Sequence, residues 1–333
     1  MEGQWAELGK EYTLHPDSPM DFELTSAEFI ATRILVGEDV FWPKADEKLL
    51  VLHFTIHNPQ DSEASACWNT FTFTAVDAKN ENREYSQYVG QEENSEALNM
   101  YLKPAQEIKA YTFIVVPAEG VIPKLIVQRS DSPVLRYDLK DKVKPLEKPY
   151  VDESDPTGAT ALGKIDAEAG TYYPTGMLDF KLDSWAYTDE TYVDYTPEEG
   201  THHLVLKVTI KNATPGKQNV YWSTFWPRVK AESGEAIEYN ENILHGTRND
   251  SLNVELEPGD EVHARFFFQV YTDDPAAKLL IHEGNEEDNN RVFIFKLAEE
   301  EASADEEVSA DEETGTDEDT GSDEENNTGN ESD

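Results

Sequence analysis

Two histidines supply the pattern in this chain that comes closest to a metal site. His53 and His57 are four residues apart in a segment that alternates apolar and polar side chains, so on a β-strand they share one face. A zinc site would need two more ligands besides this pair. Lys207 and Lys211 stand at the corresponding positions of a second, similar segment. We therefore expect both histidines to be solvent-facing residues.

Neither the other histidines nor the carboxylates form a catalytic pattern. His202 and His203 are adjacent, so their rings point to opposite faces of a strand. Glu92-Glu93 and Glu198-Glu199 are adjacent acids in a chain with 69 acidic residues, and they are expected to be loop charges. The remaining histidines are isolated in sequence: His15, His245, His263 and His282.

Motifs of known catalytic or binding chemistry are also missing from the sequence. It contains no Gly-x-Ser-x-Gly, no phosphate-binding Gly-rich loop, no His-Glu-x-x-His and no calcium loop of the Asp-x-Asp-x-Asp-Gly kind. We therefore predict that the protein is not an enzyme. No catalytic, cofactor-binding or metal-ligating residue is assigned, and no cofactor is expected.

Tryptophans are the remaining candidates for a binding role. Trp68 and Trp222 both precede Thr-Phe at the entry to a predicted strand, and a Trp placed in this way twice is more often a packing anchor than a ligand platform. Trp42, Trp185 and Trp226 have no tryptophan at the corresponding position of the other half. These three are the better candidates for a binding surface present in one half only.

The elements that must position these residues occur twice along the chain. Four segments match at a shift of 154 residues and two more at a shift of 158. A period this long indicates two tandem globular domains rather than a solenoid. The matches at 154 pair Leu50–Asn58 with Leu204–Asn212, Trp68–Phe71 with Trp222–Phe225, Leu102–Ile108 with Leu256–Val262, and Leu125–Val127 with Leu279–Ile281; those at 158 pair Phe22–Ser26 with Phe180–Ser184 and Tyr137–Leu139 with Phe295–Leu297.

Each half has the pattern of an antiparallel β-sandwich. Apolar residues alternate with polar ones, which predicts strands with one buried face. Roughly six to eight short strands with turns every 8–15 residues favour a sandwich of the immunoglobulin type, with a closed barrel as the alternative. The residues predicted to be buried are Leu52, Phe54 and Ile56 in the first half and Leu206, Val208 and Ile210 in the second.

Composition divides the chain into four parts. Residues 1–141 and 163–298 are the two predicted sandwiches, and residues 142–162 form a Pro- and Asp-rich segment that is expected to be a semi-extended linker. Residues 299–333 hold 17 acidic residues in four near-identical hexads and no Lys or Arg. This tail has almost no large apolar residue, so we expect it to be disordered.

Charge limits the classes of partner. The formal charge is −42, and without the tail the chain still has 52 acids and 27 bases, a charge of −25. This balance argues against nucleic acid and against adsorption to anionic lipid, and it favours basic partners or cations. Cys67 is the only cysteine, so no disulfide can form within the chain.

Hydropathy bears on location. No apolar run approaches the ~18 residues that a membrane span requires, and the first residues lack the basic and apolar regions of a signal peptide. Two alternatives remain, a cytosolic protein or a chain whose leader has been removed.

The order of strand patterns resembles a known family. Leu-Val-Leu-x-Phe-Thr-Ile-x-Asn, then Phe-x-Phe-x-Ala-x-Asp, then Leu-x-Pro-Gly-Asp-Glu-Val before a long apolar strand is similar to the telokin-like, immunoglobulin-like extracellular domains of bacterial surface lipoproteins, a family of unknown function. Leu256–Val262 matches the last motif fully, whereas Ala105 replaces its Gly in the first half. The resemblance implies a β-sandwich at the cell exterior without catalysis. It supplies no functional residue, and the lipid-bearing Cys of such lipoproteins is absent near the start of this sequence.

These observations predict a non-catalytic extracellular or cell-surface protein that binds an unknown protein or surface ligand through two immunoglobulin-like modules. The alternative is an acidic chaperone or buffer of basic proteins or cations that acts through the polyanionic tail. Divalent cations would bind to such a tail only weakly.

Overall fold

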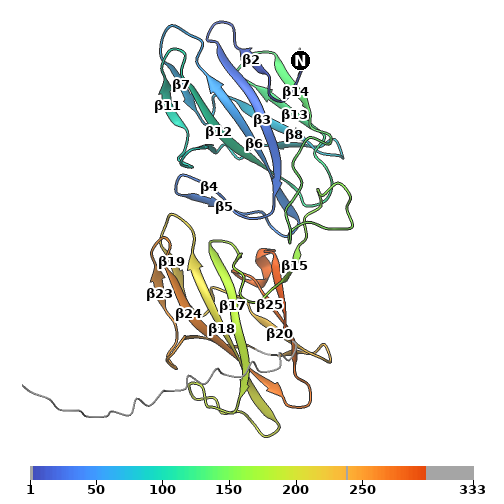
Figure 1. The fold of residues 1–333 in the computed structure, drawn as a ribbon, viewed down its shortest axis with the longest axis vertical. Helices are drawn as coiled ribbons and strands as arrows, with labels where there is room; N and C mark the ends of the chain where they lie inside the picture. Colours follow the sequence, from blue (N-terminus) through green and yellow to red (C-terminus); the bar gives the residue numbers. More distant parts are fainter. Residues whose placement is uncertain (1–2, 238, 298–333) are drawn as a thin grey trace, which may run out of the picture. The chain divides into compact units, whose positions relative to one another are not determined.

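The structure, a computed structural model, describes residues 3–237 and 239–297, and in this part of the chain its regular elements are β-strands and one 3-10 turn (Figure 1). The prediction of an all-β fold built from sandwiches is confirmed. The described residues contain no helix that is long and apolar enough to cross a bilayer. The predicted disorder of residues 299–333 concerns a segment outside the described residues.

The first sandwich consists of two five-stranded sheets and two short strand pairs. Its core joins both sheets, because the ring of Phe73 on one sheet lies 5.1 Å from Phe54 and 6.0 Å from Phe22 on the other. One sheet has the order β1 (Gly3–Ala6), β14 (Val134–Asp138), β13 (Lys124–Gln128), β8 (Thr72–Val76), β9 (Asn82–Glu84). The other has the order β10 (Val89–Gln91), β12 (Glu107–Pro117), β6 (Glu47–His57), β3 (Met20–Ile30), β2 (Glu11–Leu14), and the pairs are β7 (Ala64–Cys67) with β11 (Asn99–Leu102) and β4 (Ile34–Val36) with β5 (Asp39–Phe41).

The second sandwich repeats this topology. Its first strand pairs in parallel with its last, as β1 does with β14 in the first sandwich. One sheet has the order β15 (Lys164–Ala167), β26 (Val292–Lys296), β25 (Ala276–Ile281), β20 (Arg228–Ala231), β21 (Ala236–Ile237). The other has the order β16 (Tyr173–Pro174), β17 (Leu178–Thr188), β18 (Thr201–Asn212), β24 (Glu261–Tyr271), β22 (Tyr239–His245), with β19 (Gln218–Val220) and β23 (Val254–Leu256) as a separate pair and the 3-10 turn η1 (Glu286–Asp288) before β26.

The alternating strands bury the residues that the sequence predicts. The six side chains on β6 and β18 are at most 2% exposed, so this prediction is confirmed; they are Leu52, Phe54, Ile56, Leu206, Val208 and Ile210. A β-bulge falls at the same place in both copies, between Leu24 and Ser26 on β3 and between Leu182 and Ser184 on β17. Both copies therefore share register as well as strand order.

Two loops differ in length by four residues between the copies. Residues 31–46, between β3 and β6, are four residues longer than their counterpart 189–200. The loop 282–291, between β25 and β26, is also four residues longer than the aligned segment between β13 and β14. The shift that aligns the two copies is 154 residues before this loop and 158 after it. A third, smaller difference lies between the second and third strands of each copy, because Tyr12 pairs with Phe22 ten residues later whereas Tyr173 pairs with Phe180 seven residues later.

Residues 142–162 are folded against the first sandwich rather than extended. Leu146, Ala159 and Ala161 of this segment are buried in the first core. The buried ammonium group of Lys48 on β6 donates to the carbonyl oxygens of Ala159 and, at 3.0 Å, of Ala118. The Pro and Asp residues that suggested a semi-extended linker occur here in turns between these buried positions.

Candidate functional site

Two exposed tryptophans occupy equivalent turns in the two sandwiches. Trp68 is 46% exposed and Trp222 is 55% exposed. The expectation that they are packing anchors is therefore wrong. The buried ring of each turn is the phenylalanine three residues later, Phe71 and Phe225, which are 2% and 1% exposed.

Local hydrogen bonds fix these turns and explain the exposure. In the first sandwich the backbone N–H of Cys67 donates to Oγ1 of Thr70 at 2.8 Å, and the N–H of Thr70 donates to the carbonyl oxygen of Cys67 at 3.0 Å. In the second sandwich Tyr221 and Thr224 make the same two contacts at 2.9 and 3.0 Å. The tryptophan is the second residue of a tight turn in each case, so its side chain stands at the corner, outside the core. We call residues 67–71 and 221–225 the Trp turns.

The second sandwich adds two more exposed aromatic rings to its Trp turn. Tyr221 is 42% exposed and Trp226 is 36% exposed, and the first sandwich has Cys67 and Thr72 at these positions. Trp226 is thus an exposed aromatic residue that the first sandwich lacks. Large exposed aromatic side chains that cluster on a rigid turn are typical of protein interaction sites.

The other two unmatched tryptophans lie elsewhere. Nε1 of Trp42 is 3.3 Å from Oδ1 of Asn290, at the contact between the two sandwiches, and Trp185 packs partly buried against the second core. Neither side chain contributes to a free aromatic surface. The sequence alone could not separate these cases, because each tryptophan is flanked by strand-like patterns.

The structure brings carboxylates to the two histidines on β6. Nδ1 of His53 is 2.5 Å from Oε1 of Glu92, and its Nε2 is 3.2 Å from Oε1 of Glu28. Nδ1 of His57 is 2.8 Å from Oδ2 of Asp21. Both histidines lie on the outer face of the sheet, about a quarter exposed, and their partners come from neighbouring strands or loops. Sequence spacing within β6 could not reveal these partners.

The adjacent histidines on β18 have different surroundings. His203 is fully buried beside Tyr192 and Phe267, and its Nδ1 is 3.0 Å from the carbonyl oxygen of Glu190. His202 is half-buried, with its ring 4.6 Å from the ring of Tyr187. Neither arrangement gathers a set of catalytic groups.

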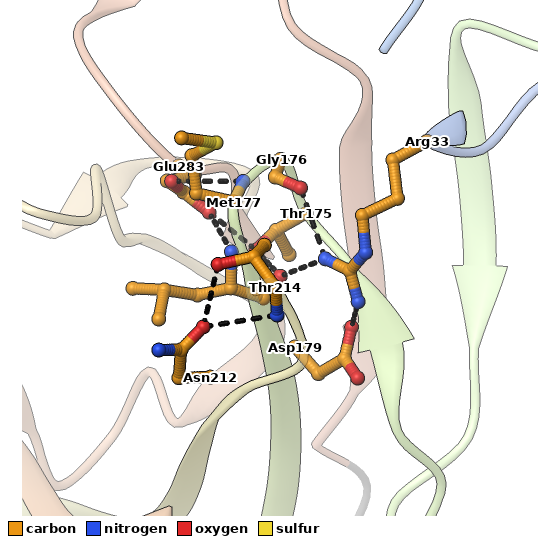
Figure 2. A network of polar contacts seen from close by, with 9 residues as sticks. Arg33, Thr175, Gly176, Met177, Asp179, Asn212, Thr214 and Glu283 are labelled. Carbon is orange, nitrogen blue, oxygen red and sulfur yellow. Dashed lines mark hydrogen bonds and ion pairs between the residues drawn. The ribbon is translucent and has the colours of Figure 1, made fainter. Parts of the chain in front are cut away.

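A polar network joins the first sandwich to the second (Figure 2). The guanidinium group of Arg33 donates to the carbonyl oxygen of Gly176 at 2.9 Å and forms an ion pair with Asp179. The carboxylate of Glu283 binds the same segment, because it accepts hydrogen bonds from the N–H groups of Met177 and Leu178 at 3.1 and 2.9 Å. Burial raises the pKa of the Glu283 carboxyl, and these donors oppose that shift. The network organises the contact between the sandwiches.

Arg291 forms the second part of this contact. Its guanidinium group donates to the carbonyl oxygens of Leu162 and Pro43 at 3.0 and 2.9 Å and also to that of Glu47. Burial lowers the pKa of Arg291 to about 10. The N–H of Ala45 donates to the carbonyl oxygen of Asn289 at 2.8 Å. The contacts of loop 31–46 and of Leu162 with residues 176–179 and 282–291 are called the junction below.

Comparison with known proteins gives likenesses of structure only. No family model matches the chain, and no curated protein matches it. Among solved structures, an uncharacterized β-sandwich protein from Clostridium difficile 630 is 14% identical with a TM-score of 0.33, over 41% of this chain and 95% of that one.

Two other solved structures are similar to this chain at the same level. A secreted protein from Mycobacterium tuberculosis, MPT63, is 12% identical with a TM-score of 0.29, over 41% of this chain and 97% of that one. A proposed lipoprotein from Bacillus subtilis is 14% identical with a TM-score of 0.29, over 39% of each chain. Each of these is a likeness of fold at low sequence identity.

Proposed function

We propose that this protein is a non-catalytic binding protein of the cell exterior, made of two immunoglobulin-like modules of the telokin-like type, and that the Trp turns are its contact surface. The observation that carries the proposal is the exposure of Trp68 and Trp222 at equivalent corners of the two sandwiches. A single solvent-exposed tryptophan needs no functional explanation. Two tryptophans that the same hydrogen-bonded turn exposes to solvent in both sandwiches favour a common binding role.

The chemistry of the Trp turns favours a protein partner. Tryptophan and tyrosine are the residues that most often dominate binding energy in protein interfaces, since they bury a large area with little loss of side-chain entropy. The Trp turn of the second sandwich, with Tyr221 and Trp226 beside Trp222, is the larger of the two surfaces. A formal charge of −25 outside the tail favours a partner whose surface is neutral or basic.

Two modules in one chain allow both Trp turns to engage at once. When two sites are linked, the second binding step is intramolecular, so weak single contacts combine into a strong one. The proposed exterior location rests on the motif Leu256–Val262 and on the strand order that it accompanies, which resemble the extracellular family named above.

Alanine variants of the Trp turns test the proposal. The full chain, labelled with a fluorophore, would be titrated onto an array of purified extracellular proteins and cell-wall glycans in parallel with Trp68→Ala, Trp222→Ala and the double variant. Trp5→Ala is the matched control, since Trp5 is 67% exposed on β1 and lies in neither Trp turn.

The expected result is a protein ligand whose binding weakens in each single variant and is lost in the double variant, while Trp5→Ala binds normally. Unchanged thermal unfolding of all variants would show that the fold is intact. If the double variant bound every ligand of the array as the wild type does, the Trp turns would not be the contact surface. Binding to glycans alone would replace the protein partner in the proposal with a carbohydrate.

A further inference from the structure

Three side chains with metal-binding atoms meet on the outer face of the first sandwich. Glu11 on β2, Asp21 on β3 and His57 on β6 each offer one ligand atom, and these atoms all lie within 4.8 Å of one another. Strand register produces the group, because Asp21 is the direct partner of His57 and Glu11 is the direct partner of Glu23, two residues further along β3. The residues on either side of Asp21 point into the core, so the three side chains share the opposite face.

The group is partly ordered by the protein itself. Asp21 is only 5% exposed, and its Oδ1 accepts from Oγ1 of Thr13 at 2.6 Å while its Oδ2 is 2.8 Å from Nδ1 of His57. Glu11 is exposed and can move toward the other two. Ligands at about 2.0–2.2 Å from a zinc ion are roughly 3.3–3.6 Å apart. The Nδ1–Oδ2 pair of His57 and Asp21, now 2.8 Å apart, therefore has to give up its hydrogen bond and separate slightly to hold the ion. A movement of Glu11 toward them then completes a three-ligand set, with water as the fourth ligand.

The second sandwich places cations where the first has this group. Lys211 corresponds to His57, and Lys181 corresponds to Glu23. Tyr172 corresponds to Glu11, because each stands one residue before the tyrosine that pairs with Phe180 or with Phe22. The ammonium groups of Lys181 and Lys211 lie 4.8 and 5.9 Å from the centre of the Tyr172 ring.

These cations balance the acids of the second sandwich. Lys181 forms an ion pair with Asp183 at 2.9 Å, and Asp179, the counterpart of Asp21, is paired with Arg33 of the first sandwich. The first sandwich has Glu107 and Asp21 directly opposite His57, and Glu23 and Lys109 two register positions away, both opposite Thr55, with Glu11 beside Glu23. Its carboxylates therefore outnumber its basic groups at the place where the acids of the second sandwich are balanced by Lys181, Lys211 and Arg33.

We propose that Glu11, Asp21 and His57 bind a divalent transition-metal ion, of which Zn²⁺ is the best fit. One imidazole nitrogen and two carboxylates neutralise the charge of the ion and supply the mixed nitrogen and oxygen set that Zn²⁺ accepts. Calcium and magnesium prefer oxygen-only sets and gain little from an imidazole. The ion stands in the first sandwich where the lysine ammonium groups stand in the second, and it joins strands β2, β3 and β6.

Calorimetric titration of ZnCl₂ into the full chain tests this site. His57→Lys is the main variant, because it installs the residue that the second sandwich already tolerates at this position. Glu11→Gln is the second variant, since Glu11 is exposed and its loss leaves the core intact. His53→Ala is the matched control, because His53 lies on the same face of β6 but contacts Glu28 and Glu92 instead.

The expected result is one Zn²⁺ site per chain whose affinity falls by at least about tenfold in His57→Lys and in Glu11→Gln and is unchanged in His53→Ala. The acidic tail is present in all four proteins, so its weak binding is a common background. A wild-type isotherm without such a site, or one that His57→Lys leaves unchanged, would overturn the proposal. The Trp turns are not involved, so either proposal can fail without the other.

Discussion

The ammonium nitrogen of Lys48 lies 2.6 Å from the carbonyl oxygen of Gly120 in the interior of the first sandwich. The same group donates to Ala118 and Ala159, so one buried lysine ties strand β6 to the loop after β12 and to the segment that leads to the second sandwich. Its charged form satisfies three carbonyl groups at once, but burial disfavours that charge and lowers the pKa of Lys48 to about 8.

The lowered pKa of Lys48 predicts a distinct pH dependence of stability. The unfolded chain keeps the Lys48 proton up to about pH 10.5, whereas the folded chain begins to lose it near pH 8. The free energy of unfolding should therefore rise with pH between these values, by at most about 1.4 kcal/mol per pH unit. Denaturant titrations of the wild type and of Lys48→Met from pH 7 to 10 measure this rise, which the variant should lack. Lys144→Met, at an exposed lysine, is the control.

Truncation of the cores should be costly. Phe54 is 2% exposed and contacts Phe22 and Phe73, so Phe54→Ala should lower the free energy of unfolding of the first sandwich by about 3–5 kcal/mol. Val208→Ala should destabilise the second sandwich by less, because a valine side chain leaves a smaller cavity. Calorimetric unfolding would measure both, and a loss below about 1 kcal/mol in Phe54→Ala would contradict the packing described.

The junction should couple the two sandwiches. Arg291→Ala removes donors to Leu162, Pro43 and Glu47 across the contact. Amide hydrogen exchange measured by mass spectrometry should become faster in loops 31–46 and 282–291, while the strands of both cores keep their protection. Arg248→Ala, at a surface arginine paired with Asp250, is the matched control. Equal exchange in both variants would mean that the junction contributes no protection.

Salt should stabilise the folded part. A charge of −25 outside the tail repels itself, and the screening length falls from ~30 Å at 0.01 M salt to ~10 Å at 0.1 M. The melting temperature should therefore be higher at 0.1 M NaCl than at 0.01 M. Differential scanning calorimetry at the two concentrations decides this, and a flat or falling value would count against a role for charge repulsion.

Removal of residues 299–333 should leave the melting temperature nearly unchanged and abolish most weak calcium binding. The tail has no Gly-turn loop that would hold its carboxylates in a fixed calcium geometry. Titration calorimetry with CaCl₂ on the full and shortened chains provides the comparison. A tight calcium site that survived the deletion would place calcium in the sandwiches instead.

The fold could be predicted because its determinants are local and repeated. Alternation along Leu52, Phe54 and Ile56 specifies which face of β6 is buried, and the second copy provides an independent instance. Lys48 is a different case, because a charged residue at the start of such a strand gives no sign that carbonyl groups from two distant segments will surround it.

The candidate sites were less accessible from sequence for two reasons. Trp68 and Trp222 were misjudged because a residue repeated in both copies can be kept for packing or for a shared surface, and only its exposure distinguishes the two. The group around His57 was missed because its carboxylates come from β2 and β3, and the pairing of β2 with β3 and of β3 with β6 that brings them to His57 cannot be read from any single strand.

The junction also limits how copies of this protein can associate. It requires the long loop 31–46 of one sandwich and the long loop 282–291 of another, and each sandwich has only one of the two in its long form. The long loop 31–46 of the first sandwich already contacts the second sandwich. The second sandwich has only the shorter loop 189–200 at the equivalent position. A head-to-tail contact that could repeat would build open filaments. Once the covalent pair has formed the junction, the long loops that make it are therefore both occupied, and the loops left free in each sandwich are the short ones.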